Sequence, residues 1–341
     1  MVEAEKILNP AVKAPIEGPR SRSEIINSHF EALRFYHRAV LETETVEAIH
    51  KMRVTTRRLQ ASLDLLAREI KVRKLKRRLR GWRRKLSTVR NYDVFLELIE
   101  KESTSRGRTR REQLELVKAI LHQRRIQRSA KVNRFLQGIN VDVIALGLAA
   151  RASASEPANL VDESQNENQM IEPVTDATGI DEHRVAAYAA ERLEQRLAEF
   201  QVMAVKSLPT NNPSELHQLR IAAKRVRYLL EIVMEMGFGD ASRALTWLRA
   251  LQDRIGDWHD LEALEEEIIT ITSAREFTKQ HLIESSRMLQ AAAHLQKKKI
   301  ALVTRLFPVR MPQHIAVTSR RLARALRRPA VSKQSNPTSI P

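Results

Sequence analysis

A ten-residue pattern near the start of the chain recurs once, and this duplication limits the folds that the chain can adopt. The first copy, 50–59, reads HKMRVTTRRL, and the second copy, 217–226, reads HQLRIAAKRV. The offset is 217 minus 50, or 167 residues, and the character of the residues matches at most positions. We therefore expect the chain to consist of two related halves.

Both copies have the periodicity of an amphipathic helix, with an apolar stripe on one side and a histidine with cations on the other. The polar side carries His50, Arg53 and Arg57 in the first copy and His217, Arg220 and Lys224 in the second. One such copy alone would be interpreted as an ordinary helix with a solvated charged face. The same order of histidine and cations in both copies favours a binding surface.

The periodicity elsewhere predicts an all-α fold with two antiparallel four-helix bundles of long helices, related by internal pseudo-two-fold symmetry. Only 9 glycines and 4% aromatic residues occur, which suits long helices. Helices are expected near 23–40, 50–70, 72–102 and 108–136, then near 181–200, 217–236, 240–271 and 276–306, with a short basic helix at 315–326. Two such bundles would turn both histidine faces toward one groove.

Composition divides the chain into five parts. We expect an irregular leader at 1–20, the first half at 21–150, an acidic polar linker at 151–180, the second half at 181–307 and a basic tail at 308–341. Cysteine is absent, and no apolar run approaches the length of a membrane span. These features predict a cytoplasmic protein without disulfides or thiolate metal sites.

The positive charge is concentrated in the first half. Residues 21–138 hold 30 Lys and Arg against 13 Asp and Glu, a net charge of +17, whereas residues 181–307 hold 18 of each. The whole chain carries +18, and so large an excess usually indicates an anionic partner. The two halves thus share a pattern but not a charge.

The segment 71–90 is the most basic part of the chain and contains no acid. On a helix, one stripe holds Arg73, Arg77, Arg80 and Arg84, and its flank holds Lys76, Arg83 and Arg90. Like charges at these spacings destabilise an isolated helix by a few tenths, roughly 0.2–0.5 kcal/mol, per pair. A bound polyanion would relieve this repulsion.

Two aspartates also coincide at the repeat offset, Asp93 in the first half and Asp260 in the second. An aspartate beside many arginines is expected to be a structural partner that fixes their geometry, rather than a catalytic acid.

The motif from His50 to Leu59, followed by Val-Arg-Asn-Tyr-Asp-Val, resembles the CHAD domain, the conserved histidine α-helical domain, and so does the second half through His217 and the run from Leu251 to Asp260. The resemblance covers roughly residues 23–307. It implies non-catalytic binding of inorganic polyphosphate in a basic groove or pore between two bundles, and association with polyphosphate granules. The chain departs from the pattern at Gln60, Asn91 and Asp257.

The resemblance and the helical faces together predict the polyphosphate-binding residues, with no catalytic residue, metal site or cofactor. They are His50, Arg53, Arg57, Arg58, Arg73, Lys76, Arg77, Arg80, Arg83, Arg84 and Arg90 in the first half, and His217, Arg220, Lys224, Arg225 and Arg227 in the second. Protonation of the two histidines predicts stronger binding near pH 6.

Three other classes of function stay open. A non-specific nucleic-acid binder would also be basic, but the few aromatic residues offer little base stacking. A metal-dependent phosphohydrolase needs clustered histidines and carboxylates, whereas the repeated motif has a cation where a second ligand should be. The third alternative is a scaffold whose partner is another protein.

Overall fold

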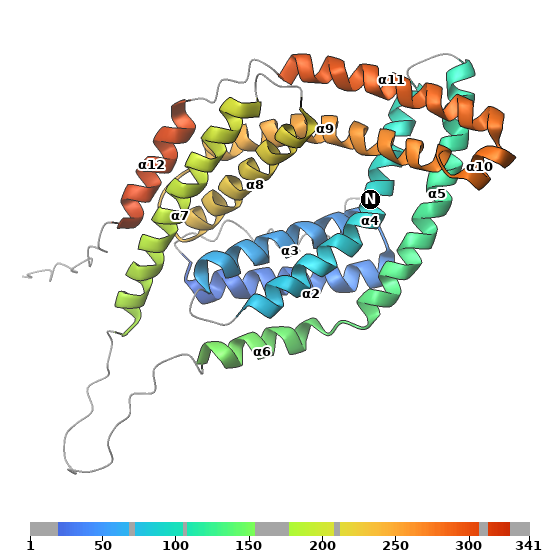
Figure 1. The fold of residues 1–341 in the computed structure, drawn as a ribbon. Coiled ribbons are helices and arrows are strands. Elements are labelled where there is room, and N and C mark those ends of the chain that lie inside the picture. Colours follow the sequence, from blue (N-terminus) through green and yellow to red (C-terminus); the bar gives the residue numbers. More distant parts are fainter. Residues whose placement is uncertain are drawn as a thin grey trace, which may run out of the picture.

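The computed structural model describes residues 20–67, 72–104, 108–153, 177–207, 212–306 and 313–327, and its regular elements in these ranges are α-helices (Figure 1). The helices are α2 (Arg22–Thr43), α3 (Val46–Leu66), α4 (Arg73–Thr104), α5 (Arg108–Gln137), α6 (Val141–Ser153), α7 (Ala177–Ser207), α8 (Pro213–Glu235), α9 (Ser242–Thr272), α10 (Arg275–Gln280), α11 (Leu282–Leu306) and α12 (Gln313–Arg327). The all-α prediction is confirmed. Below, the first half means α2–α6 and the second half α7–α12.

Side-chain caps fix where several helices begin. Ser21 and Glu24 form a capping box at the start of α2, and Thr45 accepts a hydrogen bond from the third backbone N–H of α3. Asn212 caps α8, whose first residue is Pro213. The caps at Thr45 and Asn212 thus set where the two helices that carry the repeated motif begin.

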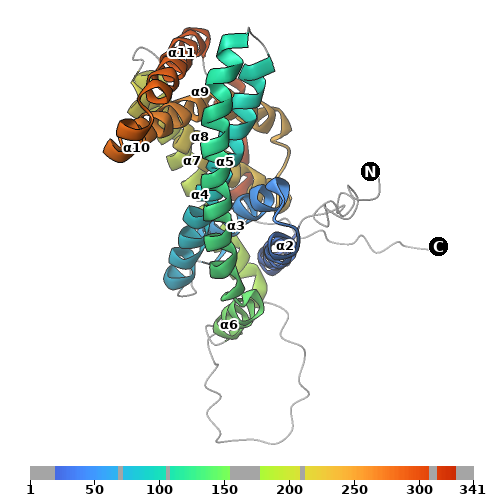
Figure 2. The same cartoon turned by 90° about the vertical axis from the view of Figure 1, so that its right-hand side faces the viewer.

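The first half packs around α2, α3, the start of α4, the end of α5 and α6. Their shared core includes Phe30, Met52, Leu79, Trp82 and Leu136. Helix α6 lies at one end of the molecule, below α5 (Figure 2), and contacts α2. The apolar stripe expected around the first motif is therefore buried, and its cationic side faces away from this core.

The second half packs around α7, α8, the start of α9 and α12. Its core includes Phe200, Val226, Leu248, Trp258 and Leu322. The turn between α8 and α9 contains Gly239 at φ +118, where an added Cβ would lie 3.2 Å from the Leu322 side chain of α12. A glycine is needed there both for the backbone conformation and for this close approach.

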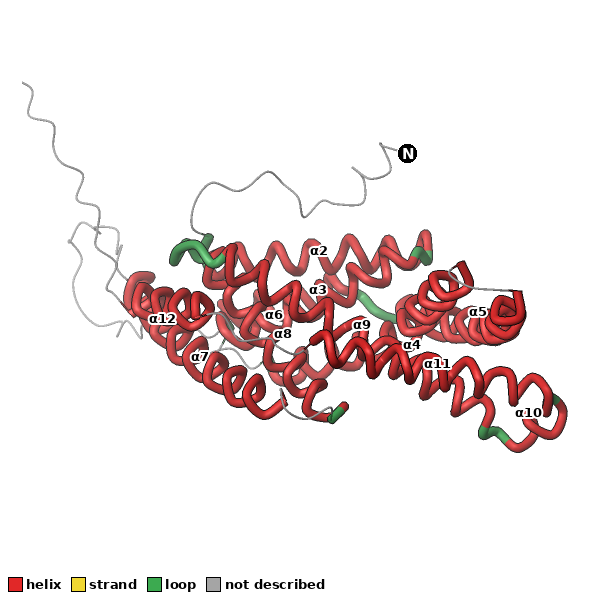
Figure 3. Tube along the Cα trace, turned by 90° about the horizontal axis from the view of Figure 1, so that it is seen from above, coloured by secondary structure: helices red, strands yellow, loops and turns green. Residues whose placement is uncertain are grey.

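A third core joins the two halves and was not predicted from the sequence. The second part of α4 and the first part of α5 pack against the second part of α9 and against α11, burying Phe95, Leu121, Leu264 and Leu295. Seen from above, this group extends toward α10 at one end of the molecule, while α7 and α12 lie at the other (Figure 3). Helices α4, α5 and α9 are long enough to take part in two cores each.

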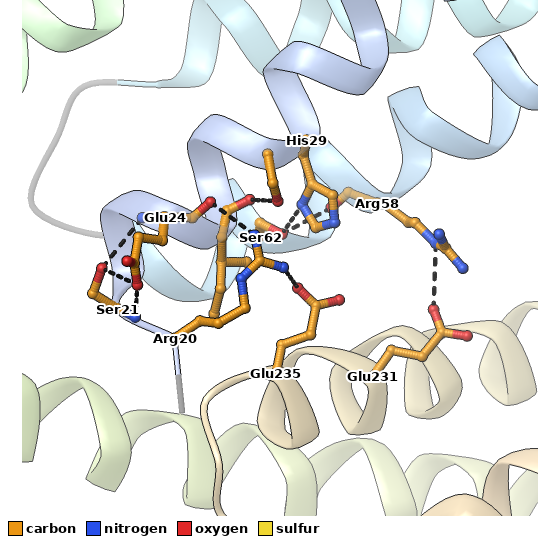
Figure 4. A network of polar contacts seen from close by, with 10 residues as sticks. Arg20, Ser21, Glu24, His29, Arg58, Ser62, Glu231 and Glu235 are labelled. Carbon is orange, nitrogen blue, oxygen red and sulfur yellow. Dashed lines mark hydrogen bonds and ion pairs between the residues drawn. The ribbon is translucent and has the colours of Figure 1, made fainter. Parts of the chain in front are cut away.

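The start of α2 is also fastened to the end of α8 (Figure 4). The backbone N–H of Arg20 donates to the carbonyl of Glu235 over 3.0 Å, and its guanidinium donates to the carboxylate over 3.4 Å. Nearby, Ser62 bonds to Nδ1 of the buried His29 over 2.8 Å. Burial, assisted by Arg58 and then Arg20, lowers the pKa of His29 to about 4. This histidine is a packing residue of the junction.

The helix boundaries differ from the sequence expectations at several places. The His50 helix ends at Leu66 rather than near residue 70, α7 begins at Ala177 rather than 181, and α6 and α10 are separate helices that were not anticipated. The expected basic helix at 315–326 is α12. Most of the leader, residues 154–176 of the linker, and 328–341 lie outside the described residues. The pseudo-two-fold symmetry and the five-part division stay predictions.

Candidate anion-binding cavity

A cavity of about 550 Å³ lies between α3 and α4 of the first half and α7 and α8 of the second. Of the described residues that line it, eight are Lys or Arg and one, Asp64, is acidic. The eight cations are Arg57, Arg80, Arg83, Arg192, Arg196, Arg220, Lys224 and Arg225. We call this space the polybasic cavity.

The two copies of the repeated motif meet at this cavity. Arg57 on α3 and Arg220 and Lys224 on α8 all line it. Burial, followed by repulsion from Arg57, Arg220, Arg53 and Arg227, lowers the pKa of Lys224 to about 6. The cationic faces of the two halves are therefore turned toward each other, as the duplication predicted.

Arg53 lies deeper in the same cluster. Burial and then repulsion from Arg57, Arg90 and Arg220 lower its pKa to about 9, against the opposing effect of Asp260. The Nε atoms of Arg53 and Arg220 are buried without a hydrogen-bond partner in the described part of the chain. Buried guanidinium donors without acceptors are costly, and an anionic ligand would supply the missing acceptors.

The predicted histidines lie beside these cations and not in apolar interiors. His217 lines the polybasic cavity, and its ring centroid is 5.5 Å from that of His259 on α9. Burial, then Arg220, His217 and Lys224, lowers the pKa of His259 to about 4. Burial lowers the pKa of both His50 and His217, assisted chiefly by Arg90 and by Arg220 respectively. The free protein therefore carries less histidine charge near pH 6 than ordinary histidines would.

The basic helix α4 contributes one residue of its flank and one of its stripe to the cavity lining. Arg83 lines the cavity and donates to Gln60 over 3.0 Å, and Lys76 forms an ion pair with Asp64 at 2.6 Å. Of the four stripe residues, Arg80 lines the cavity. The other three, Arg73, Arg77 and Arg84, are exposed and are not among its lining residues.

Two further predicted residues, Arg58 and Arg227, form ion pairs with the carboxylate of Glu231. Arg58 on α3 lies 3.6 Å from Glu231 on α8, an ion pair between the halves (Figure 4), and Arg227 and Arg249 lie 3.6 and 3.5 Å from the same residue. Neither Arg58 nor Arg227 lines the cavity. Arg225 does line it, at 3.6 Å from Glu199. Arg58 therefore links the two halves, whereas Arg227 pairs with Glu231 within α8.

The aspartates that coincide in the repeat have different surroundings. Asp93 is buried and accepts a hydrogen bond from Arg125 over 2.6 Å, which is the structural role expected for it. Asp260 is also largely buried, which raises its pKa, and it interacts with Arg220, Arg90 and Lys224 of the cationic cluster.

Sequence reasoning missed three residues of the site, Arg192 and Arg196 on α7 and His259 on α9. The two arginines are four residues apart and alternate with buried Leu193 and Leu197, so helical spacing was a usable signal. Within the described ranges, no group of three or more His, Asp or Glu is placed to hold a metal ion. No helix there has the length and apolar character needed to cross a membrane.

The fold and this site define an all-α protein of two helical halves that enclose a polybasic cavity. Residues 24–268 match the model of the CHAD domain, and the chain therefore belongs to the CHAD domain family. The curated proteins searched give no match.

Two solved structures have a similar fold. The CHAD domain from the plant Ricinus communis aligns with a TM-score of 0.57 and 20% identity, over 88% of this chain and 96% of that one. PptA from Streptomyces chartreusis aligns with a TM-score of 0.54 and 14% identity, over 84% and 97%. At these identities the likeness concerns the fold alone.

Proposed function

We propose that the protein binds inorganic polyphosphate in the polybasic cavity. The observation that carries the proposal is the composition of the lining, with eight basic side chains, seven of them arginines, against one carboxylate among the described residues. So many cations around one space repel one another unless an anion of high charge density lies between them.

The types of residue suit a flexible phosphate chain. Arginine outnumbers lysine by seven to one among the eight lining cations, and each guanidinium can contact two phosphate oxygens at once. The cations come from four helices, so successive phosphates would meet them from both halves. The exposed arginines Arg73, Arg77 and Arg84 supply a further basic surface for the part of a long chain that leaves the cavity.

A non-specific nucleic-acid binder is the alternative, because phosphate contacts alone support such binding. Among the described lining residues, Tyr228 and His217 supply the two aromatic rings that could stack on a base, and base stacking is the usual platform for single strands. The lining therefore favours a polymer of phosphate without bases.

Competition decides between the two ligands. Labelled long-chain polyphosphate is bound to the full chain, and unlabelled polyphosphate, duplex DNA and single-stranded RNA are added at equal phosphate concentration. We expect polyphosphate to compete at least tenfold better than either nucleic acid, and affinity to fall steeply with salt as counterions return to the ligand. Equal competition, or binding insensitive to salt, would contradict the proposal.

The proposal describes a binding protein of the cytoplasm that associates with polyphosphate granules through this cavity. It includes no hydrolysis. Release of phosphate from polyphosphate in the presence of divalent metal, abolished by substitutions in the cavity, would overturn that part. A fluorescent fusion tests the location, since the Arg57→Gln, Arg220→Gln variant should leave the granules while the parent protein stays on them.

A further inference from the structure

Lys224 has surroundings unlike those of an ordinary lysine. It lines the polybasic cavity from α8, and the charges that act on it most strongly are cations: Arg53 and Arg57 on α3, and Arg220 and Arg227 on its own helix. Within the described residues, no carboxylate forms an ion pair with its amine. Other charged or titratable groups also face it or share its cavity. They are Asp64 on α3, Arg80 and Arg83 on α4, Arg192 and Arg196 on α7, His217, Arg225 and Tyr228 on α8, and His259 and Asp260 on α9.

These surroundings keep the amine neutral at physiological pH. Its pKa is lowered to about 6 by burial first and by the neighbouring cations second. A desolvated lysine next to cationic groups has a free lone pair and becomes a nucleophile, whereas an exposed lysine is protonated and unreactive at the same pH.

Lys299 on α11 shows the opposite arrangement at a similarly sheltered position. Its Nζ atom lies 2.7 Å from Glu265 and 3.9 Å from Glu262, and its side chain is 16% exposed. The comparison separates burial from charge, because both lysines are sheltered but only Lys224 is surrounded by guanidinium groups.

We propose that Lys224 is an acylation site whose donor is an acyl phosphate, of which acetyl phosphate is the simplest. Arg57 and Arg220 hold the phosphate of the donor, and Nζ of Lys224 attacks the carbonyl carbon. The N–C amide bond forms, the C–O bond to phosphate breaks with its electron pair, and the nitrogen loses its proton to the departing phosphate or to water. The guanidinium groups stabilise the charge on the leaving phosphate.

The acylation step needs only the cavity, whereas its consequence rests on the proposed function. An amide at Lys224 cannot be protonated, and its acyl group occupies space that a phosphate chain would use. Acylated protein is therefore expected to bind polyphosphate at least tenfold more weakly.

The test is acetylation of the full chain with acetyl phosphate at pH 6 to 9.5, followed by peptide mass spectrometry. At pH 7.5, Lys224 should be acetylated at least tenfold faster than the exposed Lys74 and Lys297, and Lys299 should react slowest. The rate at Lys224 should level off above about pH 7, while rates at exposed lysines continue to rise about tenfold per pH unit. A rate at Lys224 no higher than at Lys74, or one that climbs to pH 9.5, would overturn the proposal.

A second comparison identifies the donor. The Arg57→Gln variant should slow acetylation of Lys224 by acetyl phosphate at least fivefold more than acetylation by a phosphate-free donor, the N-hydroxysuccinimide ester of acetic acid. Equal slowing with both donors would reject the acyl phosphate. Because no polyphosphate is present, failure here leaves polyphosphate binding standing, and a protein that fails to bind polyphosphate could still be acetylated.

Discussion

Two of the places where the halves of the molecule meet differ in how their charges are arranged. Where α4 and α5 pack against α9 and α11, cations face carboxylates: Arg124 on α5 lies 2.6 Å from Glu267 on α9, and Lys298 on α11 pairs with Glu102 on α4. The hydroxyl of Tyr92 also donates to Glu267, over 3.0 Å. At the polybasic cavity, cations of one half mainly face cations of the other.

This difference distinguishes contacts that stabilise the fold from a site that is suited to bind a ligand. The paired contacts satisfy one another and cover a common apolar core, so they stabilise the assembly of the halves. The cavity leaves buried guanidinium donors without acceptors, which costs folding free energy. In the ranges that the structure describes, the unpaired guanidinium donors are found at the polybasic cavity and not at the α4–α5/α9–α11 contact. This difference indicates that the cavity is suited to binding an anion.

The largest expected effect is on ligand affinity. Replacing Arg57 and Arg220 by Gln removes two guanidinium groups from the cavity lining, one from each half. Charge-assisted hydrogen bonds contribute about 1.5–3 kcal/mol each, so polyphosphate affinity should fall at least about 100-fold. Titration of labelled polyphosphate by fluorescence anisotropy measures the change.

The matched control removes two positive charges from the other junction, by Arg124→Gln and Lys298→Gln. This variant should bind polyphosphate within about threefold of the parent protein, because a weak general electrostatic effect remains, but it should unfold at lower urea. If both pairs of substitutions weakened binding equally, net charge and not the cavity would determine affinity.

The second effect is a gain in stability from Lys224→Met. The folded pKa of Lys224, about 6, lies below the usual 10.5 of an unfolded lysine. The unfolded state therefore binds more protons between these values, and the group costs stability that grows as pH falls from 10.5 to 6. Urea unfolding should show the variant more stable by on the order of 2 kcal/mol at pH 7.5, with a larger gain at pH 6 and a smaller one at pH 9.

Lys299→Met tests whether that gain is specific to the cavity. Its amine is paired with Glu262 and Glu265, so its loss leaves two carboxylates near each other and should lower stability. A gain in both variants would mean that any sheltered lysine is costly, and the contrast between the junctions would fail.

The third effect is smaller and concerns the paired junction. Glu267→Gln weakens the contacts with Arg124 and Tyr92 and should reduce the free energy of unfolding by about 1 kcal/mol. The control is Glu97→Gln, which removes an exposed pair with Lys101 on the same helix and should cost less than about 0.5 kcal/mol. An unchanged urea midpoint for Glu267→Gln would show that this junction is held by its apolar core alone.

Local periodicity in the sequence was enough to predict the cationic faces that form the polybasic cavity. The repeat placed His217, Arg220 and Lys224 on a cationic face, and the duplication predicted that this face would meet the face carrying Arg57. The apolar stripe of α4 continues beyond Arg90 as Tyr92 and Phe95, yet nothing local says which helix covers it.

The third core and the partners of individual arginines depend on tertiary packing. Arg58 and Arg57 are neighbours in one motif, but the first meets Glu231 of α8 and the second faces the cavity. Their different environments follow from the crossing of α3 and α8, which helical periodicity does not specify. Helical spacing puts Arg192 and Arg196 on one polar face, but only the fold brings that face to the cavity.

The smallest effect is the pH dependence of polyphosphate binding, which the sequence assigned to His50 and His217. Burial lowers the pKa of each in the free protein, so they carry less charge near pH 6 than ordinary histidines, whereas the pKa of Lys224 is lowered to about 6. A bound polyanion raises the pKa of Lys224, so binding takes up a proton above pH 6 and affinity increases as pH falls from 8 to 6.

We expect an increase of about threefold to tenfold over that range, since one proton changes affinity by at most about tenfold per pH unit. Lys224→Met should make the affinity nearly independent of pH, while the His50→Gln, His217→Gln variant should keep the slope of the parent protein. The reverse outcome would show that the histidines, and not Lys224, take up the proton on binding. Lys224 would then be charged up to pH 8, and its charge state would not distinguish the cavity from the paired junction.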